Sequence, residues 1–290
     1  MRLLLGPEAI DNKKLHFGTS LDVLGISCML DRNGLCLRPA ADKKKKCLET
    51  ILGALESGVL HAGCAQKLAG RLSWAQTFMF HKLGRAMIRP IFDQKWNKSG
   101  VISTALRTAL GWWCSVLAME ICEMRPWHTR EAPPVHIFVD ARGTPPRCAA
   151  VAFIDGRCMY SDGEPSSRIM KSFAARKDAQ ICGLEMLAIA LGLSVFAEEL
   201  RGRKAIIFSD NIGAEAATRK GTAKSWDHCQ IIHEIWTMAA QNQTHLWIER
   251  VPTDDNIADL PSREEYKLIE DLPGGAEWRK PVIASLFLNG

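Results

Sequence analysis

The sequence predicts an α/β protein in which a mixed sheet of five strands follows a mainly helical region with a β-hairpin. Three observations support this prediction. Apolar residues of 1–132 recur mostly at helical spacing, whereas residues 133–266 mix strand and helix patterns. Proline and polar residues at 125–134 interrupt the periodicity between the two parts. A chain of 290 residues is long enough to form a core in each.

The first elements are a hairpin and a series of helices. Residues 21–38 alternate apolar and polar side chains around Asp31-Arg32-Asn33-Gly34, and an Asn-Gly step is a strong hairpin signal. Helices are predicted over 41–57, 62–83 and 101–122. The run from Lys43 to Lys46 has two readings, a solvated helix face or a contact to backbone phosphates.

Strands and helices then alternate. Short apolar runs predict five strands, at 135–140, 148–154, 157–160, 204–209 and 245–251. The turn between the second and third of them is Asp155-Gly156. Helical spacing predicts helices at about 177–200, 211–219, 225–241 and 256–265. Three antiparallel strands followed by a helix, a strand, helices and a strand form an α/β plan with a mixed sheet.

Composition places the chain among ordinary globular proteins. The hydrophobic fraction is 47% and the charged fraction 24%. No run approaches the roughly 18 apolar residues of a membrane span, and the apolar start is too short for a signal peptide. We therefore expect a soluble, intracellular protein without a membrane partner, in either nucleus or cytoplasm. Ten cysteines without a C-x-x-C pair argue against structural zinc and favour reduced core thiols.

Charge is distributed unevenly along the chain. Residues 1–132 contain 19 Lys+Arg and 11 Asp+Glu, whereas 133–290 contain 18 and 21. The first part therefore carries +8 and the second −3, for a net charge of +5. A basic part joined to an acidic one suits an enzyme of nucleic acids, because phosphate contacts supply most non-specific affinity. A merely solvated basic face is the alternative.

Four carboxylates lie within or at the end of separate apolar elements. Asp140 ends the first predicted strand, Asp210 ends the fourth, Glu185 lies on the buried side of a helix, and Asp259 lies in the last helix. A carboxylate among apolar neighbours is costly unless its charge is compensated. Hard cations such as Mg²⁺ bind carboxylate oxygens, and two cations about 4 Å apart can cleave a phosphodiester.

Each carboxylate also has a local explanation. Asp140 could form a turn, Asp210 could cap the next helix, Glu185 could be exposed, and Asp259 could pair with Arg263 one turn on. Their order and their placement on successive elements favour a common metal site. Without a cation, the clustered carboxylates would repel one another and some would be protonated.

At these residues the chain resembles the ribonuclease H domain of retroelement reverse transcriptases. Two segments support the resemblance: Ile207–Ala214, similar to the family's strand-Asp-helix motif, and Asn256–Arg263, similar to its N-x-x-A-D-x-x-S-R ending. The resemblance covers about 133–266 and implies a ribonuclease H-like fold. The implied activity is that of a hydrolase, an endonuclease that cuts the RNA strand of RNA–DNA hybrids. The implied cofactor is Mg²⁺, or alternatively Mn²⁺. The catalytic residues and metal ligands would be Asp140, Glu185, Asp210 and Asp259.

The first part extends this resemblance. Residues Leu21–Ile26 resemble the L-G-hydrophobic hairpin that follows the polymerase active site of reverse transcriptases. The helices after it, including Ala65–Ser73, are similar to the thumb and connection region, which grips the primer–template duplex. The implied organisation is a thumb/connection-like region at 1–132, a ribonuclease H-like domain at 133–266 and a C-terminal tail at 267–290. The polymerase motif Y-x-D-D, the fingers and the palm are missing. We therefore expect a polyprotein fragment without DNA polymerase activity.

The chain departs from the family pattern in two places. The loop 251–256 lacks the histidine that many members carry, and Asp255 in that loop is a rival to Asp259 as fourth ligand. The turn after Asp140 contains Arg142, Pro145 and Pro146 and is bulkier than usual. The alternative function is therefore a catalytically inactive remnant that only binds nucleic acid or a protein partner.

Aromatic and histidine residues give a weaker signal. The second part contains the tryptophans Trp226, Trp236 and Trp247, which could stack on bases. Their helical or strand setting favours packing in the core. Two histidines, His228 and His233, are expected on a helix face rather than in catalysis.

Overall fold

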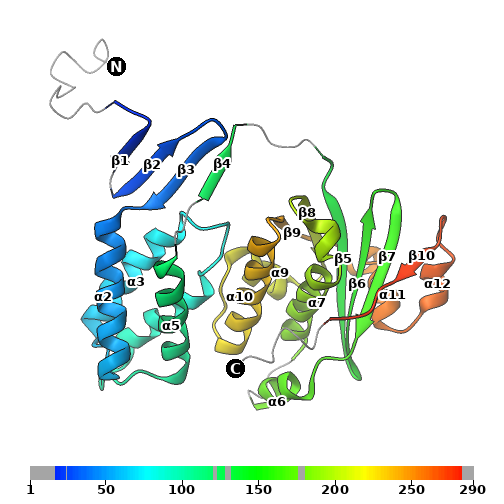
Figure 1. Cartoon of the computed structure of the whole chain (residues 1–290). Coiled ribbons are helices and arrows are strands. Elements are labelled where there is room, and N and C mark those ends of the chain that lie inside the picture. The colour runs from blue at the N-terminus through cyan, green and yellow to red at the C-terminus, as the bar shows by residue number, and fades with distance from the viewer. Residues whose placement is uncertain (1–16, 24, 120–122, 128–131, 176–179, 283–290) are drawn as a thin grey trace, which may run out of the picture.

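A mixed sheet of six strands organises the second part of the chain (Figure 1). The computed structural model describes residues 17–23, 25–119, 123–127, 132–175 and 180–282. We call 17–127 the helical unit and 132–282 the α/β unit. The strands of the α/β unit lie in the order β10-β7-β6-β5-β8-β9.

Three antiparallel strands and two parallel ones form the predicted part of this sheet. β5 (Val135–Gly143), β6 (Pro146–Ile154) and β7 (Arg157–Gly163) are antiparallel neighbours. β8 (Lys204–Ser209) pairs parallel with β5, and β9 (His245–Arg250) pairs parallel with β8. All five strands were predicted from apolar runs, although β5, β6 and β7 extend a few residues further than expected.

The sixth strand corrects the expectation of a five-stranded sheet. β10 (Ala276–Trp278) pairs parallel with β7 and comes from the stretch expected to be a tail. It is only three residues long and follows Gly274 and Gly275, whose φ angles are 93° and 73°. A strand of this length is too short to show an alternation of apolar and polar residues in the sequence. It is defined by its backbone pairing with β7 alone.

Helices cover the two faces of the sheet unequally. One face packs against α7 (Ile181–Val195), α9 (Ile212–Lys220) and α10 (Trp226–Gln241), as Figure 1 shows. Among the residues that the structure describes, the other face carries the short helices α11 (Asp259–Ser262) and α12 (Tyr266–Glu270), which pack over β5, β6 and β7. Helices α6 (Ser167–Ala175) and α8 (Ala197–Leu200) complete the unit.

The predicted helix at 177–200 is divided in the structure. Residues 176–179 lie outside the described part, α7 begins at Ile181, and α8 is a separate turn after Phe196. α7 is buried almost all round because it lies between the sheet and α10. This position explains its almost uniformly apolar sequence, in which Glu185 is the exception.

The helical unit combines a small sheet with a helix bundle. The sheet has the order β1-β2-β3-β4, formed by antiparallel strands Ser20–Val23, Ile26–Leu30, Gly34–Pro39 and Glu123–Pro126. The bundle contains α2 (Ala41–Ser57), α3 (Ala62–Gln76), α4 (Arg89–Asp93) and α5 (Thr104–Ala118). Two 3-10 turns, η3 (Ala86–Ile88) and η4 (Gln94–Trp96), flank α4.

Local signals explain several boundaries of the helical unit. α2 has the predicted bounds and ends at Gly58, which has a φ of 70° and donates its N–H to the carbonyl of Ala54. In the hairpin turn, the Asp31 carboxylate accepts the N–H groups of Asn33 and Gly34. A Cβ on Gly34 would lie 2.2 Å from the Arg125 carbonyl oxygen, so this glycine permits the close approach of β4.

Four expectations for the helical unit need correction. α3 ends at Gln76 rather than 83, and α5 spans 104–118 rather than 101–122, of which 120–122 lie outside the described residues. The start of the expected boundary forms β4 and belongs to the small sheet. Cys36 is disulfide-bonded, which corrects the expectation of reduced thiols at this position.

The two units meet along α10 and β9. His81 of the helical unit lies 3.0 Å from His245 of β9, measured between Nε2 and Nδ1, and its ring stacks on Trp236 of α10. Gly221, with a φ of 76°, lies so close to the helical unit that its Cβ would be 2.7 Å from that of Lys82. Within the described ranges, none of the helices has the length and apolar character that crossing a membrane requires.

Candidate metal centre

The register of two parallel strands brings the first two carboxylates together. Phe138 of β5 lies opposite Phe208 of β8. Two residues further along each strand, Asp140 and Asp210 therefore reach the same end of the sheet. The ends of parallel strands are a common location for functional side chains, because they collect residues distant in the sequence.

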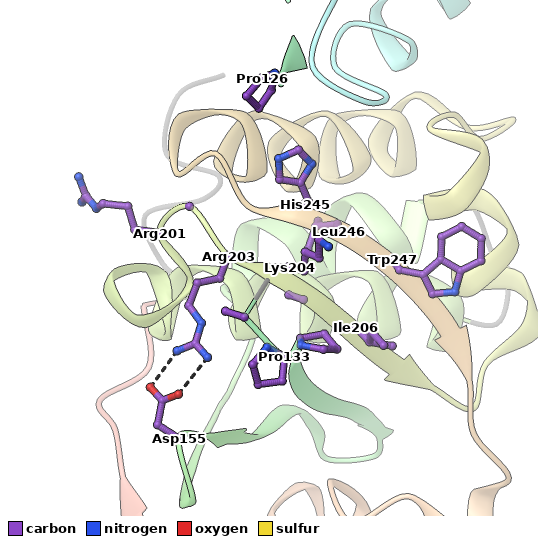
Figure 2. Close-up of a pocket in the computed structure, with 14 residues that line it drawn as sticks. Pro126, Pro133, Asp155, Arg201, Arg203, Lys204, Ile206, His245, Leu246 and Trp247 are labelled. Atoms are coloured by element: carbon purple, nitrogen blue, oxygen red, sulfur yellow. Dashed lines mark hydrogen bonds and ion pairs between the residues drawn. The ribbon is translucent and has the colours of Figure 1, made fainter. Parts of the chain in front are cut away.

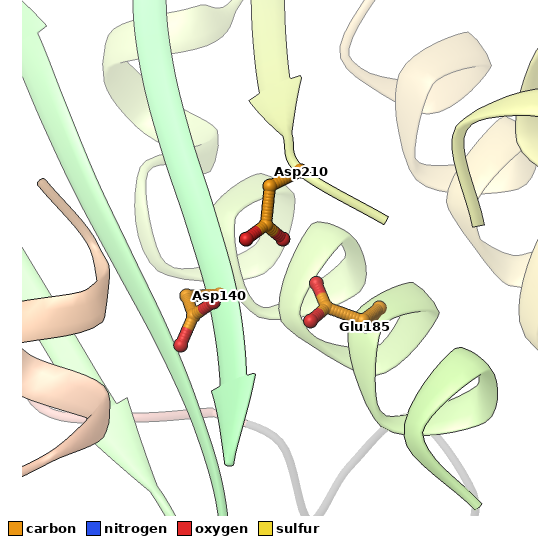
Figure 3. Close-up of side chains that lie close together, drawn as sticks. All are labelled: Asp140, Glu185 and Asp210. Carbon is orange, nitrogen blue, oxygen red and sulfur yellow. The ribbon is translucent and has the colours of Figure 1, made fainter. Parts of the chain in front are cut away.

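Glu185 completes a triad from the covering helix. One carboxylate oxygen each of Asp140, Glu185 and Asp210 lies within 4.8 Å of the others. Figure 3 shows the three side chains pointing toward one another from β5, α7 and the end of β8. Asp140 and Glu185 are buried, with 6% and 3% of their surfaces exposed, and Asp210 is half-buried.

Burial and like charge make this triad unfavourable as three anions. Burial raises the pKa of Glu185 to about 9, and the nearby charges of Asp140 and Asp210 add to the effect. A backbone hydrogen bond from Ala141 and the hydroxyl of Ser209, 3.5 Å from Glu185 Oε2, partly oppose this rise in pKa. Glu185 is therefore protonated at neutral pH unless a cation compensates the charge.

The pKa of Asp140 is also raised. Burial raises its pKa, a hydrogen bond to the Ser262 side chain lowers it, and the charges of Asp210 and Asp259 raise it further. The donor set of the triad therefore fits a hard divalent cation, because carboxylate oxygens are its preferred ligands. This triad can bind a metal ion.

The fourth predicted ligand, Asp259, lies in the same cavity but outside the triad. The cavity has a volume of about 650 Å³ and is lined by all four carboxylates. Asp259 Oδ1 accepts a hydrogen bond of 2.7 Å from Arg263 Nε. The local ion pair that was the alternative explanation of Asp259 is therefore also formed. Its rival Asp255 is exposed in the turn η5 (Thr253–Asp255) and does not line the cavity.

Asn256 positions the segment that carries Asp259. Its side chain is buried, donates a hydrogen bond of 2.9 Å to the Val139 carbonyl and accepts one from the Ala258 N–H. Val139 directly precedes Asp140, so this amide connects the last segment to the strand of the triad. In the sequence, the position of Asn256 in the N-x-x-A-D motif is the signal for this role.

Hydrogen bonds of Arg142 fix the bulky turn after Asp140. Arg142 donates from Nε to the carbonyl of Pro145 at 3.1 Å and from Nη2 to Glu264 at 2.9 Å. The Thr144-Pro145 peptide bond is cis. Arg142 and Arg263 both line the cavity, but each is paired with a carboxylate.

The predicted aromatic and histidine residues separate into core and surface. Trp236 is buried and donates its indole N–H to the Thr218 carbonyl, and Trp226 is half-buried between the two units. His233 is buried, and His228 packs edge-on against Phe173. Trp247 departs from the expectation of core packing, because 53% of its surface is exposed.

Comparison with known protein families and with curated proteins finds no match for this chain. Fold and site therefore define a class rather than a family. The protein is an α/β protein with a mixed six-stranded sheet, flanking helices and an acidic triad that can bind a metal ion.

Proposed function

We propose that this chain is a metal-dependent endonuclease of the ribonuclease H type, acting on the RNA strand of RNA–DNA hybrids. The observation that supports it best is the convergence of Asp140, Glu185 and Asp210, with Asp259 lining the same cavity. These residues come from four separate elements and occur in the order that the sequence motifs imply. Mg²⁺ is the proposed cation, because the donors are carboxylate oxygens.

In this proposal each carboxylate has a defined task. Asp140 and Asp210 would each contribute ligands to two cations, and Glu185 and Asp259 would each contribute to one. Bound cations would activate a water molecule for in-line attack and stabilise the leaving 3′ oxygen. Ser209 and the backbone of Ala141 orient Glu185.

The helical unit would hold the duplex through its phosphates. Lys43, Lys44, Arg71 and Trp74 line a cavity of about 350 Å³ between α2 and α3. Contacts to phosphates recognise the shape of a hybrid rather than its sequence. The resemblance to retroelement reverse transcriptases suggests that such a chain derives from a polyprotein, and the missing Y-x-D-D motif predicts no DNA polymerase activity.

A cleavage assay with matched variants tests the proposal. The wild-type chain, Asp210→Asn and Asp254→Asn are incubated with a labelled RNA–DNA hybrid and Mg²⁺. Asp254 is an exposed acid outside the cavity and serves as the control. We expect cleavage by the wild type and Asp254→Asn and none by Asp210→Asn. Asp255→Asn and Asp259→Asn, assayed in parallel, identify the fourth ligand.

One observation favours the second candidate, an inactive protein that only binds nucleic acid or a protein partner. Arg263 neutralises Asp259, the one predicted ligand outside the triad. If neither the wild type nor any variant cleaves while hybrid binding stays intact, the inactive binder is the better description. Thermal melting of each variant distinguishes loss of activity from loss of folding.

A further inference from the structure

A second cavity lies at the opposite end of the parallel strands, where β8 and β9 begin. Its volume is about 820 Å³, and we call it the strand-start pocket (Figure 2). The carboxylates lie where β5 and β8 end, so the two cavities are separated by the length of the sheet. The residues of the strand-start pocket that matter here are Arg201, Arg203, Lys204, Ile206 and Trp247.

The pocket continues into a row of side chains on the uncovered face of the sheet. The register places Phe153 opposite His136, His136 opposite Ile206, and Ile206 opposite Trp247. These four residues therefore form one row across β6, β5, β8 and β9. Each is exposed or half-exposed, and within the described chain α11 and α12 pack over β5, β6 and β7 but not over β8 and β9.

A second row strengthens the aromatic character of this face. Phe138 and Phe208 are opposite each other in the register, and their rings stack with centroids 4.8 Å apart. Both are half-buried. This stacked pair extends the aromatic surface of the row toward the ends of the strands.

Trp247 is held in place while its surface stays accessible. Its indole N–H donates to Glu249 at 2.8 Å, and the Arg219 guanidinium lies 5.0 Å from the ring centroid. Because 53% of the side chain is exposed, the ring is oriented by polar contacts rather than by burial. Such an oriented ring loses little conformational freedom when a ligand stacks on it.

Cations dominate the border of the pocket. Arg201, Arg203 and Lys204 line the pocket together with one acid, Asp155. Arg201 also pairs with Glu198 of α8 at 3.0 Å. Arg203 binds both oxygens of Asp155, at 2.8 and 3.0 Å, as the dashed lines in Figure 2 show. Lys204 is exposed and makes no ion pair with the residues that the structure describes, so it can contact an anionic ligand directly.

We propose that the strand-start pocket and its aromatic row bind single-stranded nucleic acid. Unpaired bases can stack on Trp247 and the neighbouring row, and Lys204, Arg201 and Arg203 lie where phosphates of the same strand can reach them. A duplex hides its base faces and fits this row poorly. The cationic border distinguishes this site from a purely apolar protein contact. The site is separate from the carboxylates and goes beyond the proposed nuclease function.

Fluorescence anisotropy with a labelled single-stranded oligothymidine of about 15 nucleotides tests this site. EDTA is present, so the result does not depend on cleavage or on the carboxylate site. Trp247→Ala should weaken binding about tenfold, because a stacked base is lost. Lys204→Glu should weaken it and lower the slope of log affinity against log salt by about one.

Two matched variants serve as controls. Trp278→Ala removes a tryptophan of equal exposure, 51%, from strand β10 of the same sheet. Lys267→Glu reverses an exposed lysine on α12. Both should bind the oligonucleotide like the wild type, and melting temperatures report whether any variant has lost its fold.

Four results would overturn the site. Oligonucleotide binding could be unaffected by both test variants, or reduced equally by the controls. Alternatively, Trp247→Ala could dissociate a dimer in sedimentation while oligonucleotide binding persists, which would make the row a protein contact. Complete displacement of the oligonucleotide by unlabelled RNA–DNA hybrid would show one shared site. A chain that fails to cleave hybrids but passes these tests loses the nuclease proposal alone.

Discussion

The two ends of the parallel strands in the α/β unit carry opposite charge. Where β5 and β8 end, Asp140 and Asp210 lie together with Glu185. Where β8 begins, Lys204 lies beside Arg203 at the strand-start pocket. Parallel strands bring all their starts to one edge of the sheet and all their ends to the other. One set of strands can therefore position two sites of different chemistry.

Burial separates the two ends further. Glu185 lies on the buried helix α7. Burial raises its pKa to about 9, which favours its neutral form. Lys204 and Trp247 remain exposed, although Arg219 of α9 lies over the Trp247 ring. A cation bound to the carboxylates would favour the charged form of Glu185, whereas the strand-start pocket is exposed and lies at the other end of the strands. We therefore expect the two ends to respond independently to mutation, cations and pH.

The largest expected effect is a complete separation of activities by single substitutions. Asp140→Asn removes a charge from the triad and should reduce hybrid cleavage about a thousandfold or more. Single-strand binding in EDTA should remain at the wild-type level, because Asp140 lies at the far end of the sheet. Trp247→Ala should show the reverse pattern in the same two assays. If Asp140→Asn lowered both activities in a folded protein, the two ends would not be independent.

Cation binding should stabilise the acidic end. At a Mn²⁺ concentration about 100 times the dissociation constant, folding gains about 2.7 kcal/mol, which raises the melting temperature by several degrees. Glu185→Gln should lose most of this increase. Glu234→Gln is the control, since Glu234 on α10 has its pKa raised by burial but does not line the cavity. Equal stabilisation of all three proteins by Mn²⁺ would place the cation elsewhere.

The same variants should differ without metal. Folding raises the pKa of Glu185 from 4.5 to about 9, so between these values the folded state binds a proton that the unfolded state does not. Stability is therefore lost as pH rises through this window. Metal-free Glu185→Gln should be more stable than the wild type at pH 8, by an amount on the order of 2 kcal/mol, and equal to it near pH 4. Urea denaturation in EDTA at both pH values measures this.

His233 shows what burial does without clustered like charges. It packs edge-on against Trp112, with ring centroids 4.7 Å apart, and burial lowers its pKa from 6.5 to about 4. The unfolded state therefore binds more protons between these values, and stability falls as pH drops from 6.5 toward 4. The free energy of unfolding of the wild type therefore falls at pH 4.5, and His233→Leu should reduce this fall by about 2 kcal/mol, as measured by urea denaturation. His61→Leu, at an exposed site, is the matched control.

The smallest expected effect concerns the ion pair at the edge of the cavity. Arg263→Gln frees Asp259 from its partner and should lower the half-saturating Mg²⁺ concentration for cleavage about threefold, because exposed ion pairs are weak. Arg157→Gln, an exposed arginine on β7, is the control. A higher Mg²⁺ requirement for Arg263→Gln would instead assign Arg263 a contact with the substrate.

Some elements could be predicted because their signals are local. α2 has the predicted bounds, since Pro39 and Gly58 border it. The strand at 204–209 also has its predicted bounds, because a short apolar run is bordered by polar residues. β4 and β10 were missed because three or four residues show no periodicity and only pairing with a distant strand defines them. Trp247 was expected in the core, but which face of a strand is covered depends on helices elsewhere in the chain.

The sequence by itself determined the residue types of the candidate site, their order and the elements that carry them. The sequence also allowed both interpretations of Asp259, as a metal ligand and as the ion-pair partner of Arg263. The second could be predicted because Arg263 is only four residues away. Only the tertiary structure decided that Asp140, Glu185 and Asp210 converge, that Asp255 does not line their cavity, and that a basic aromatic surface remains uncovered. The physical reason is that distances between side chains on separate elements depend on strand register and helix packing, which arise from contacts far apart in the sequence.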